Sequence, residues 1–245
     1  MVMLDNQVRY KEARLHEMII SVDLAKSIDF STYAICEAMP KGVTDARGQS
    51  ITMMTLKVVN LQQIPRNTDY TDVAQIIHDV FYDKRTWLQT KFTHRMIKPS
   101  LLVDAGGVGE GVCDTVSRYM GLRPIRYKLV RGTSRVIRHD YFNWTVPRPY
   151  LFSLLDGAFG SDRVIVDPRL RHAPTLIEEL GRLQLEQNEE TGTIRVTHRE
   201  GEHDDLAIAV GAANWWAHQP ERPGRPYVLV DGRPIKASYA DRIWR

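Results

Sequence analysis

The sequence predicts an α/β protein with a mixed sheet, antiparallel in its first three strands and parallel afterwards. Three short apolar, β-branched segments follow one another near the N-terminus, and a strand, a helix and another strand come next. With 245 residues, 43% of them hydrophobic, the chain suits one folded domain with a sizeable core. We expect a single domain over residues 1–245, with a core at about 18–218 and a C-terminal extension at 219–245.

The first three strands are expected at residues 18–24 (MIISVDL), 32–38 (TYAICEA) and 52–60 (TMMTLKVVN). Each segment is short, and the third alternates apolar and polar residues as a half-buried strand does. Their short connections favour an antiparallel meander.

A helix is expected to begin near Thr71 and Asp72, because apolar residues then recur at the spacing of one buried helix face: Val73, Ile76, Ile77, Val80 and Phe81. Leu101 to Asp104, between a proline and a glycine cluster, reads as a buried strand. A helix over about 111–120 and a strand over 124–130 complete a parallel crossover.

Two more helices are expected in the C-terminal half. Thr175 and Glu178 form a capping-box pattern ahead of an apolar face made by Leu176, Ile177, Leu180 and Leu183. A second, strongly apolar helix begins near Asp204. The tail from Pro220 is rich in Pro, Gly and Arg, which indicates an irregular or hairpin-like extension.

Composition excludes several classes of protein. Cys36 and Cys113 lack the paired spacing of a zinc site, and they support no disulfide framework, so a reduced environment is expected. The N-terminus has no apolar core of a secretory signal, and the most apolar stretch, 206–217, is too short to span a bilayer. The net charge of +3 allows only local basic patches.

Three acidic positions stand out as candidate metal ligands. Asp23 lies within an apolar strand, where an unpaired carboxylate is costly, and Asp104 ends another buried strand. Asp204 and Asp205 open the apolar helix. A two-metal phosphodiesterase needs such hard oxygen ligands brought together from separate elements.

Each acid also has a purely structural interpretation. Asp204 suits a helix N-cap, and Asp104 before Ala-Gly-Gly suits a tight turn. Asp23, between Val22 and Leu24 on a central strand, has the weakest structural explanation.

In order along the chain, SVDLAKSIDFSTYAI, LLVDAGGVGEGVCDTV and EHDDLAIAVGAA resemble the three acidic motifs of the nuclease domain of tailed-bacteriophage terminase large subunits, within the RNase H-like superfamily. The segment VPRPYLFSLLDGAFGSDRVIV resembles the part that those nucleases place before the last motif. The resemblance covers roughly residues 19–216 and implies an RNase H-like mixed sheet of five or more strands, flanked by helices.

The resemblance implies that Asp23, Asp104 and Asp205 are catalytic and hold two Mg²⁺ or Mn²⁺ ions. Asp204 is an auxiliary candidate, because related resolvases align one residue differently. His203 is a second auxiliary candidate that could orient water or phosphate, and Asp29 a third that could equally stabilise a turn.

A basic cluster runs from Arg123 to Arg148, where the resemblance implies a hairpin near the active site. The residues expected to bind DNA phosphates are Arg123, Arg126, Lys128, Arg131, Arg135 and Arg138. A solvated face is the alternative, and the neighbouring Tyr141, Phe142 and Trp144 can pack internally or stack on bases.

The implied function is a metal-dependent endonuclease that cuts double-stranded viral DNA concatemers during packaging in the host cell cytoplasm, with little sequence specificity. Expected partners are the terminase ATPase domain, the small terminase subunit and the portal. No GxxxxGK[ST] motif occurs, so the ATPase domain is expected to be absent from this chain. Alternatives are an RNase H-like resolvase or transposase, an actin-like kinase that would use the DAGGVGEG glycines, and a non-catalytic DNA-binding assembly module.

Overall fold

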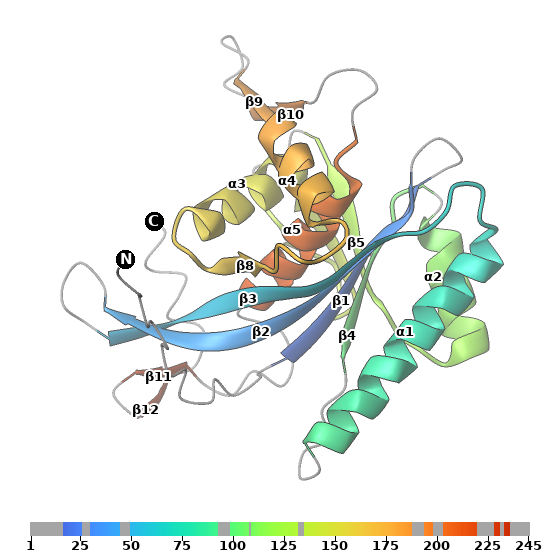
Figure 1. Cartoon of the computed structure of the whole chain (residues 1–245), viewed down its shortest axis with the longest axis horizontal. Coiled ribbons are helices and arrows are strands. Elements are labelled where there is room, and N and C mark those ends of the chain that lie inside the picture. The colour runs from blue at the N-terminus through green and yellow to red at the C-terminus, as the bar shows by residue number, and fades with distance from the viewer. Residues whose placement is uncertain are drawn as a thin grey trace, which may run out of the picture.

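The computed structural model describes residues 17–25, 30–44, 50–92, 99–107, 109–131, 135–187, 194–197, 203–219, 228–230 and 233–235. The candidate Asp29 lies outside these ranges. In the described part of the chain, an eight-stranded mixed sheet runs through the centre, with helices on both faces (Figure 1).

The sheet has the strand order β6-β7-β5-β4-β1-β2-β3-β8. Its first three strands form the expected antiparallel meander, with β4, β5 and β7 continuing parallel to β1. The short edge strand β6 runs antiparallel to β7, while β8 runs parallel to β3 at the other edge. The strands are β1 (Glu17–Asp23), β2 (Thr32–Thr44), β3 (Ser50–Gln63), β4 (Ser100–Asp104), β5 (Ile125–Val130), β6 (Ile137–Arg138), β7 (Asn143–Pro147) and β8 (Val164–Val166).

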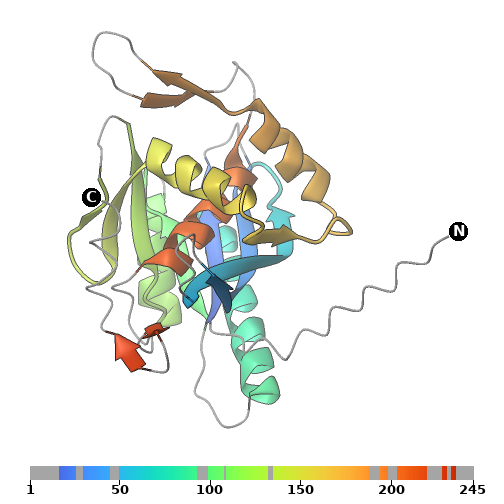
Figure 2. The same ribbon diagram turned by 90° about the vertical axis from the view of Figure 1, so that its left-hand side faces the viewer.

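Among the described residues, helices pack on both faces of the sheet (Figure 2). On the first face lie α1 (Tyr70–Lys91) and α2 (Gly109–Met120). On the second lie α3 (Arg148–Phe159), α4 (Ala173–Arg182) and α5 (Asp205–His218). Two small hairpins are separate from the sheet: β9 (Gln184–Gln187) with β10 (Ile194–Thr197), and β11 (Val228–Val230) with β12 (Arg233–Ile235).

Alternation along β1 divides the core into two layers. Met18, Ile20 and Val22 pack towards α1 and α2, whereas Ile19 packs towards α3 and α5. The second layer contains α5, which is buried without interruption from Asp205 to Ala217. A helix that is apolar all round needs cover on every side, and here the sheet and the helices α3 and α4 provide it.

These observations confirm the predicted fold class, with antiparallel strands first, parallel strands next and helices on both faces. The tail contains the expected hairpin, β11 with β12. None of the described helices is both long and apolar enough to cross a membrane.

The prediction for α4 is wrong in two details. The helix begins at Ala173, so Thr175 lies inside it and does not cap it, and Glu178 contacts Arg182 instead. Ile177 is 56% exposed, while Glu179 is buried. The buried face is therefore rotated from the expected one and includes an acid.

Candidate active site

Asp23 and Asp104 are neighbours at the carboxyl ends of two parallel strands. Val22 is paired with Val103 in the ladder of β1 and β4, so the two aspartates come next on adjacent strands. Because Val22 and Val103 pack towards α1 and α2, alternation directs both aspartates towards the face that carries α5. Asp104 ends its strand as predicted, and Asp23, expected inside a strand over 18–24, is the last residue of β1.

Asp23 is an acid in an unfavourable electrostatic environment, with only 6% of its surface exposed. Burial raises its pKa well above the ordinary value, and the nearby charges of Asp104, Asp205 and Asp204 raise it further. The Arg148 guanidinium opposes this effect. Acids from β1, β4 and the start of α5 thus lie close enough to act on one another's ionisation.

Asp104 forms a hydrogen bond within the turn after β4 and also interacts electrostatically with its surroundings. Its Oδ1 accepts a hydrogen bond from the Gly106 N–H at 2.8 Å, so the carboxylate does shape the turn after β4. Burial raises the pKa of Asp104 to about 6, although that hydrogen bond and the charge of Lys128 act in the opposite direction. A turn-forming role and a place in the acid cluster therefore coexist.

Asp204 and Asp205 sit at the start of α5, and both are buried. Asp204 occupies the N-cap position considered for it, but its side chain forms no capping hydrogen bond. Its carboxylate contacts Arg148. The backbone carbonyl of Asp205 accepts a hydrogen bond from Thr32 Oγ1 at 3.0 Å, which ties the start of α5 to β2.

Arg148 is part of this site, although the sequence grouped it with the basic cluster. Its side chain is 18% exposed and Asp204's is 7% exposed, so the pair is mostly removed from solvent. Arg148 is also the first residue of α3, where the helix dipole disfavours a cation. The guanidinium is held there by the acids, against the local preference of its own helix.

Glu179 is a second residue of the site that the sequence does not predict. It comes from α4, is 6% exposed, and its Oε2 accepts a hydrogen bond from the Ala207 N–H at 2.9 Å. Burial raises the pKa of Glu179 to about 8, and Asp205 and Asp204 contribute to the rise. The available signal was its spacing, three residues after Leu176 on the buried side of the helix.

The remaining auxiliary candidate within the described residues is His203. It is half-buried and comes directly before Asp204. The structure therefore brings His203, Asp204 and Asp205 together at one helix end.

Part of the basic cluster lies at the same edge of the sheet as the acids. The strands β1, β4, β5 and β7 are parallel, so Arg131, directly after β5, shares an edge with Asp23 and Asp104. Arg135 precedes β6, whose antiparallel pairing with β7 directs its start towards this edge too. Arg131 and Arg135 are both exposed. Lys128 is close enough to lower the pKa of Asp104.

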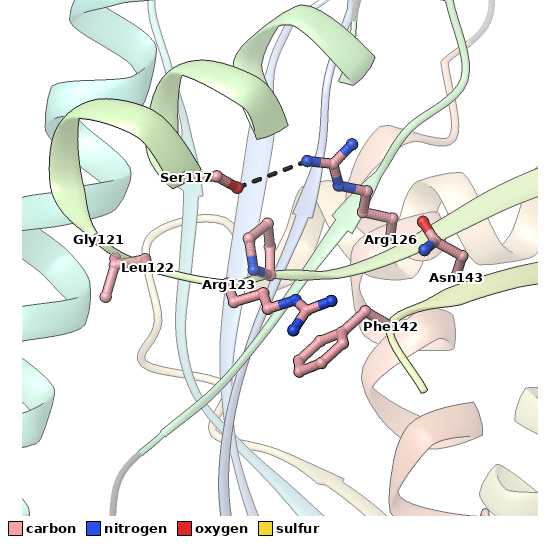
Figure 3. A pocket seen from close by; sticks show the side chains of 8 residues that line it. Ser117, Gly121, Leu122, Arg123, Arg126, Phe142 and Asn143 are labelled. Carbon is pink, nitrogen blue, oxygen red and sulfur yellow. Dashed lines mark hydrogen bonds between the residues drawn. The ribbon is translucent and has the colours of Figure 1, made fainter. Parts of the chain in front are cut away.

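Arg123 and Arg126 lie instead near the opposite, amino edge. They line a pocket of about 410 Å³ between the end of α2 and the starts of β5 and β7 (Figure 3). Arg126 Nη2 donates to Asp114 Oδ1 at 2.9 Å, and the Arg123 guanidinium lies 3.9 Å from the centre of the Phe142 ring. The basic residues thus divide between two edges.

Arg138 and the aromatic residues beside it form a locally packed group. The Arg138 guanidinium lies 5.3 Å from the centre of the Trp144 ring, and its Nε donates to the Asp140 carbonyl at 3.1 Å. Trp144 is buried and packs edge-on against Trp215 of α5. Of the two interpretations of Trp144, internal packing is the one observed.

The acid cluster fits a divalent cation in donor type. Among the residues that the structure describes, no three His, Cys, Asp or Glu side chains are grouped closely enough to hold a metal ion. The candidate donors are nevertheless hard carboxylate oxygens from separate elements, as Mg²⁺ and Mn²⁺ prefer. A cation would relieve the repulsion that raises the pKa of Asp23, provided that the carboxylates draw closer together.

Comparison with known proteins gives structural likeness alone. No family model matches the sequence, and no curated protein matches it. The structure is similar to the large terminase nuclease of the thermophilic phage G20c, at 14% identity and a TM-score of 0.46 over 80% of each chain. It is similar to the bacteriophage SPP1 large terminase nuclease domain with bound Mn, at 11% identity and 0.46 over 82% of this chain and 86% of that one. The human cytomegalovirus terminase nuclease domain, Mn soaked, gives 12% identity and 0.49 over 90% and 92%.

Proposed function

We propose that this chain is a divalent-metal-dependent endonuclease that hydrolyses phosphodiester bonds in double-stranded DNA. The observation that carries the proposal is that Asp23 and Asp104 end the adjacent strands β1 and β4, while Asp204 and Asp205 open α5, which packs against β1. Burying carboxylates in this way is unfavourable for the fold by itself, and it is the arrangement that a phosphodiesterase needs to bind cations.

Asp23, Asp104 and Asp205 are the proposed ligands of two Mg²⁺ or Mn²⁺ ions. When bound, such a pair lowers the pKa of an attacking water and stabilises the leaving 3′ oxygen. The contribution of the chain is to hold three carboxylates on rigid element ends and to keep bulk water away from Asp23. His203 and, by family resemblance, Asp29 stay auxiliary candidates.

We propose Asp205 as the third ligand, as the family resemblance implies, and keep Asp204 as an auxiliary candidate. The Arg148 guanidinium contacts the Asp204 carboxylate and so balances the negative charge of Asp204 within the protein. Asp205 lies in the first turn of α5, and its carbonyl is fixed by Thr32. In this scheme Asp204 and Arg148 support the site from one side.

DNA is proposed to approach along the carboxyl edge of the sheet, where Arg131 and Arg135 are exposed near the acids. Removing both side chains should weaken DNA binding and reduce the salt dependence of the affinity by about one unit of slope per lost phosphate contact. Arg123→Ala, at the amino edge, is the matched control. A double variant whose salt slope equals that of the control would rule out this approach.

The biological setting that we propose follows from the family resemblance. The substrate would be concatemeric viral DNA, cut during packaging in the host cell cytoplasm with little sequence preference, because phosphate contacts carry no base information. The proposed partners are a terminase ATPase domain, a small terminase subunit and a portal.

The direct test is cleavage of supercoiled plasmid by purified protein with Mn²⁺, comparing the wild type with Asp23→Asn. We expect nicked and linear products from the wild type and a loss of at least a hundredfold in rate for the variant. Asp156→Asn, an exposed aspartate on α3, is the matched control and should cleave normally. Undiminished cleavage by Asp23→Asn would refute the proposed site.

Cleavage and binding assays distinguish the alternative functions. A resolvase would prefer branched over linear DNA. An actin-like kinase would bind ATP and leave DNA intact; the described residues form one main sheet, whereas that fold uses two duplicated halves. A non-catalytic module would bind DNA without cleaving it and without being stabilised by Mn²⁺.

A further inference from the structure

The start of α5 carries the acids and yet lacks a cap of its own. The first N–H groups of a helix have no partners within the helix and need acceptors from elsewhere. Asp204 stands where a capping side chain belongs, but it forms no capping hydrogen bond and contacts Arg148 instead. Another group must accept from the first turn of α5.

Glu179 supplies that acceptor from a different helix. Its Oε2 lies 2.9 Å from the backbone N of Ala207, two residues after Asp205 and 28 residues along the chain from Glu179. The contact is buried, and α4 packs against α5. A carboxyl group is a costly acceptor here, because burial and the nearby charges of Asp204 and Asp205 disfavour its ionised form.

The backbone around Asp205 is therefore held from two directions. Thr32 of β2 donates to the Asp205 carbonyl at 3.0 Å, and Glu179 of α4 accepts from Ala207. These contacts fix both the position of the first turn along the helix axis and its rotation about that axis. The rotation decides where the Asp205 carboxylate points.

We propose that Glu179 is a positioning residue that caps α5 from α4 and thereby directs Asp205 towards Asp23 and Asp104. This inference rests on the proposed function, because it treats Asp205 as a metal ligand. Glu179 acts through the backbone of α5. Its amide analogue should therefore replace it, since an amide oxygen accepts the same hydrogen bond.

The test compares Glu179→Met, which preserves bulk but removes the acceptor, with Glu179→Gln, which keeps an acceptor. The matched control is Glu178→Gln, the adjacent glutamate, which is exposed on the same helix. Two quantities are measured: the Mn²⁺ dissociation constant of EDTA-treated protein by titration calorimetry without DNA, and kcat and KM for plasmid cleavage.

We expect Glu179→Met to weaken Mn²⁺ binding about tenfold or more, as loss of a residue supporting metal ligands does. The kcat should fall by a similar factor, with KM for DNA within about twofold, because the phosphate-binding residues are untouched. Glu179→Gln and Glu178→Gln should stay within about threefold of the wild type in both quantities. Should Glu179→Met fail to fold by circular dichroism, Glu179→Asp replaces it, because the shorter side chain withdraws the acceptor.

Two outcomes would overturn the inference. Unchanged Mn²⁺ affinity in Glu179→Met, with only a lower melting temperature, would show a role in stability alone. A Glu179→Gln variant as defective as Glu179→Met would show that the carboxylate charge itself is needed, which positioning does not require. Failure of the wild type to bind Mn²⁺ or cut DNA would refute the proposed function, and the inference with it.

Discussion

Replacing Asp104 with Asn should stabilise the metal-free protein at neutral and alkaline pH while it weakens metal binding. Asp104 is a buried carboxylate whose pKa burial raises to about 6 from the ordinary 3.8. The variant keeps the turn after β4, because an amide oxygen can accept the Gly106 N–H as the carboxylate does. The change therefore removes a charge and leaves the local hydrogen bond.

The sign and size of the effect follow from the two ionisation states. As the pH rises from 3.8 to about 6, the unfolded chain loses the Asp104 proton before the folded protein does, so the wild type loses stability over this range. Above pH 6 the accumulated loss is about 3 kcal/mol, at 1.36 kcal/mol per pH unit. Allowing for burial of the amide, the variant should be about 1–3 kcal/mol more stable than the wild type at pH 8. Below pH 4 this gain should be absent, so that the variant is no more stable than the wild type.

The assay is urea unfolding in EDTA at pH 4, 6 and 8, with Asp156→Asn as a control for loss of an exposed negative charge. In parallel, Mn²⁺ should raise the unfolding midpoint of the wild type and have little effect on Asp104→Asn. A variant that is no more stable than the wild type at pH 8 would refute the reasoning, because Asp104 would then carry no electrostatic cost.

Two further predictions concern the framework around the acids. In Gly109→Ala the new Cβ would lie 1.7 Å from the Asp104 carbonyl oxygen, so the end of β4 must shift; we expect a lower melting temperature and slower plasmid cleavage. In Gly111→Ala the new Cβ would meet no neighbouring atom, and alanine favours a helix more than glycine does. This variant should therefore melt at the same temperature as the wild type or higher. Arg148→Ala should lower the free energy of unfolding, measured with urea, by about 3–5 kcal/mol, because the buried Asp204 carboxylate would lose its cationic partner. Adding Asp204→Ala should recover part of that loss; a strictly additive double variant would contradict the pairing.

The sheet and the acids on it could be predicted because their signals are local. Strands β1 and β4 are short apolar runs, and an aspartate at such a strand end stands out against its neighbours. Short connections predicted the antiparallel start, and the order strand, helix, strand predicted the parallel continuation. Asp23 and Asp104 could therefore be assigned to two strands from the sequence, whereas their adjacency follows from the observed pairing of β1 with β4.

What the sequence could not supply depends on tertiary contacts. Arg148 looks like one more member of a basic run until β7 carries it to the edge beside Asp204. Helix α3 lacks a side-chain cap, which weakens its local signal, although Pro149 in its first turn suits a helix start. Glu179 is hidden because its partner is a backbone N–H on another helix.

The sequence also could not show that the basic residues lie at two different edges of the sheet. Arg123 and Arg131 are only eight positions apart. They lie at opposite edges because β5 runs between them across the sheet. Spacing along the chain cannot distinguish residues at the two ends of one strand.

The continuous burial of α5 has a consequence for how the protein opens. Because every residue from Asp205 to Ala217 is buried, the acid-bearing turn cannot fray into solvent as exposed helix ends do. Its amide protons should exchange with solvent only when the whole domain unfolds. Asp205, the proposed third ligand, thus keeps its place as long as the protein is folded, and control of the proposed cleavage would act on the approach of DNA or on cation loading.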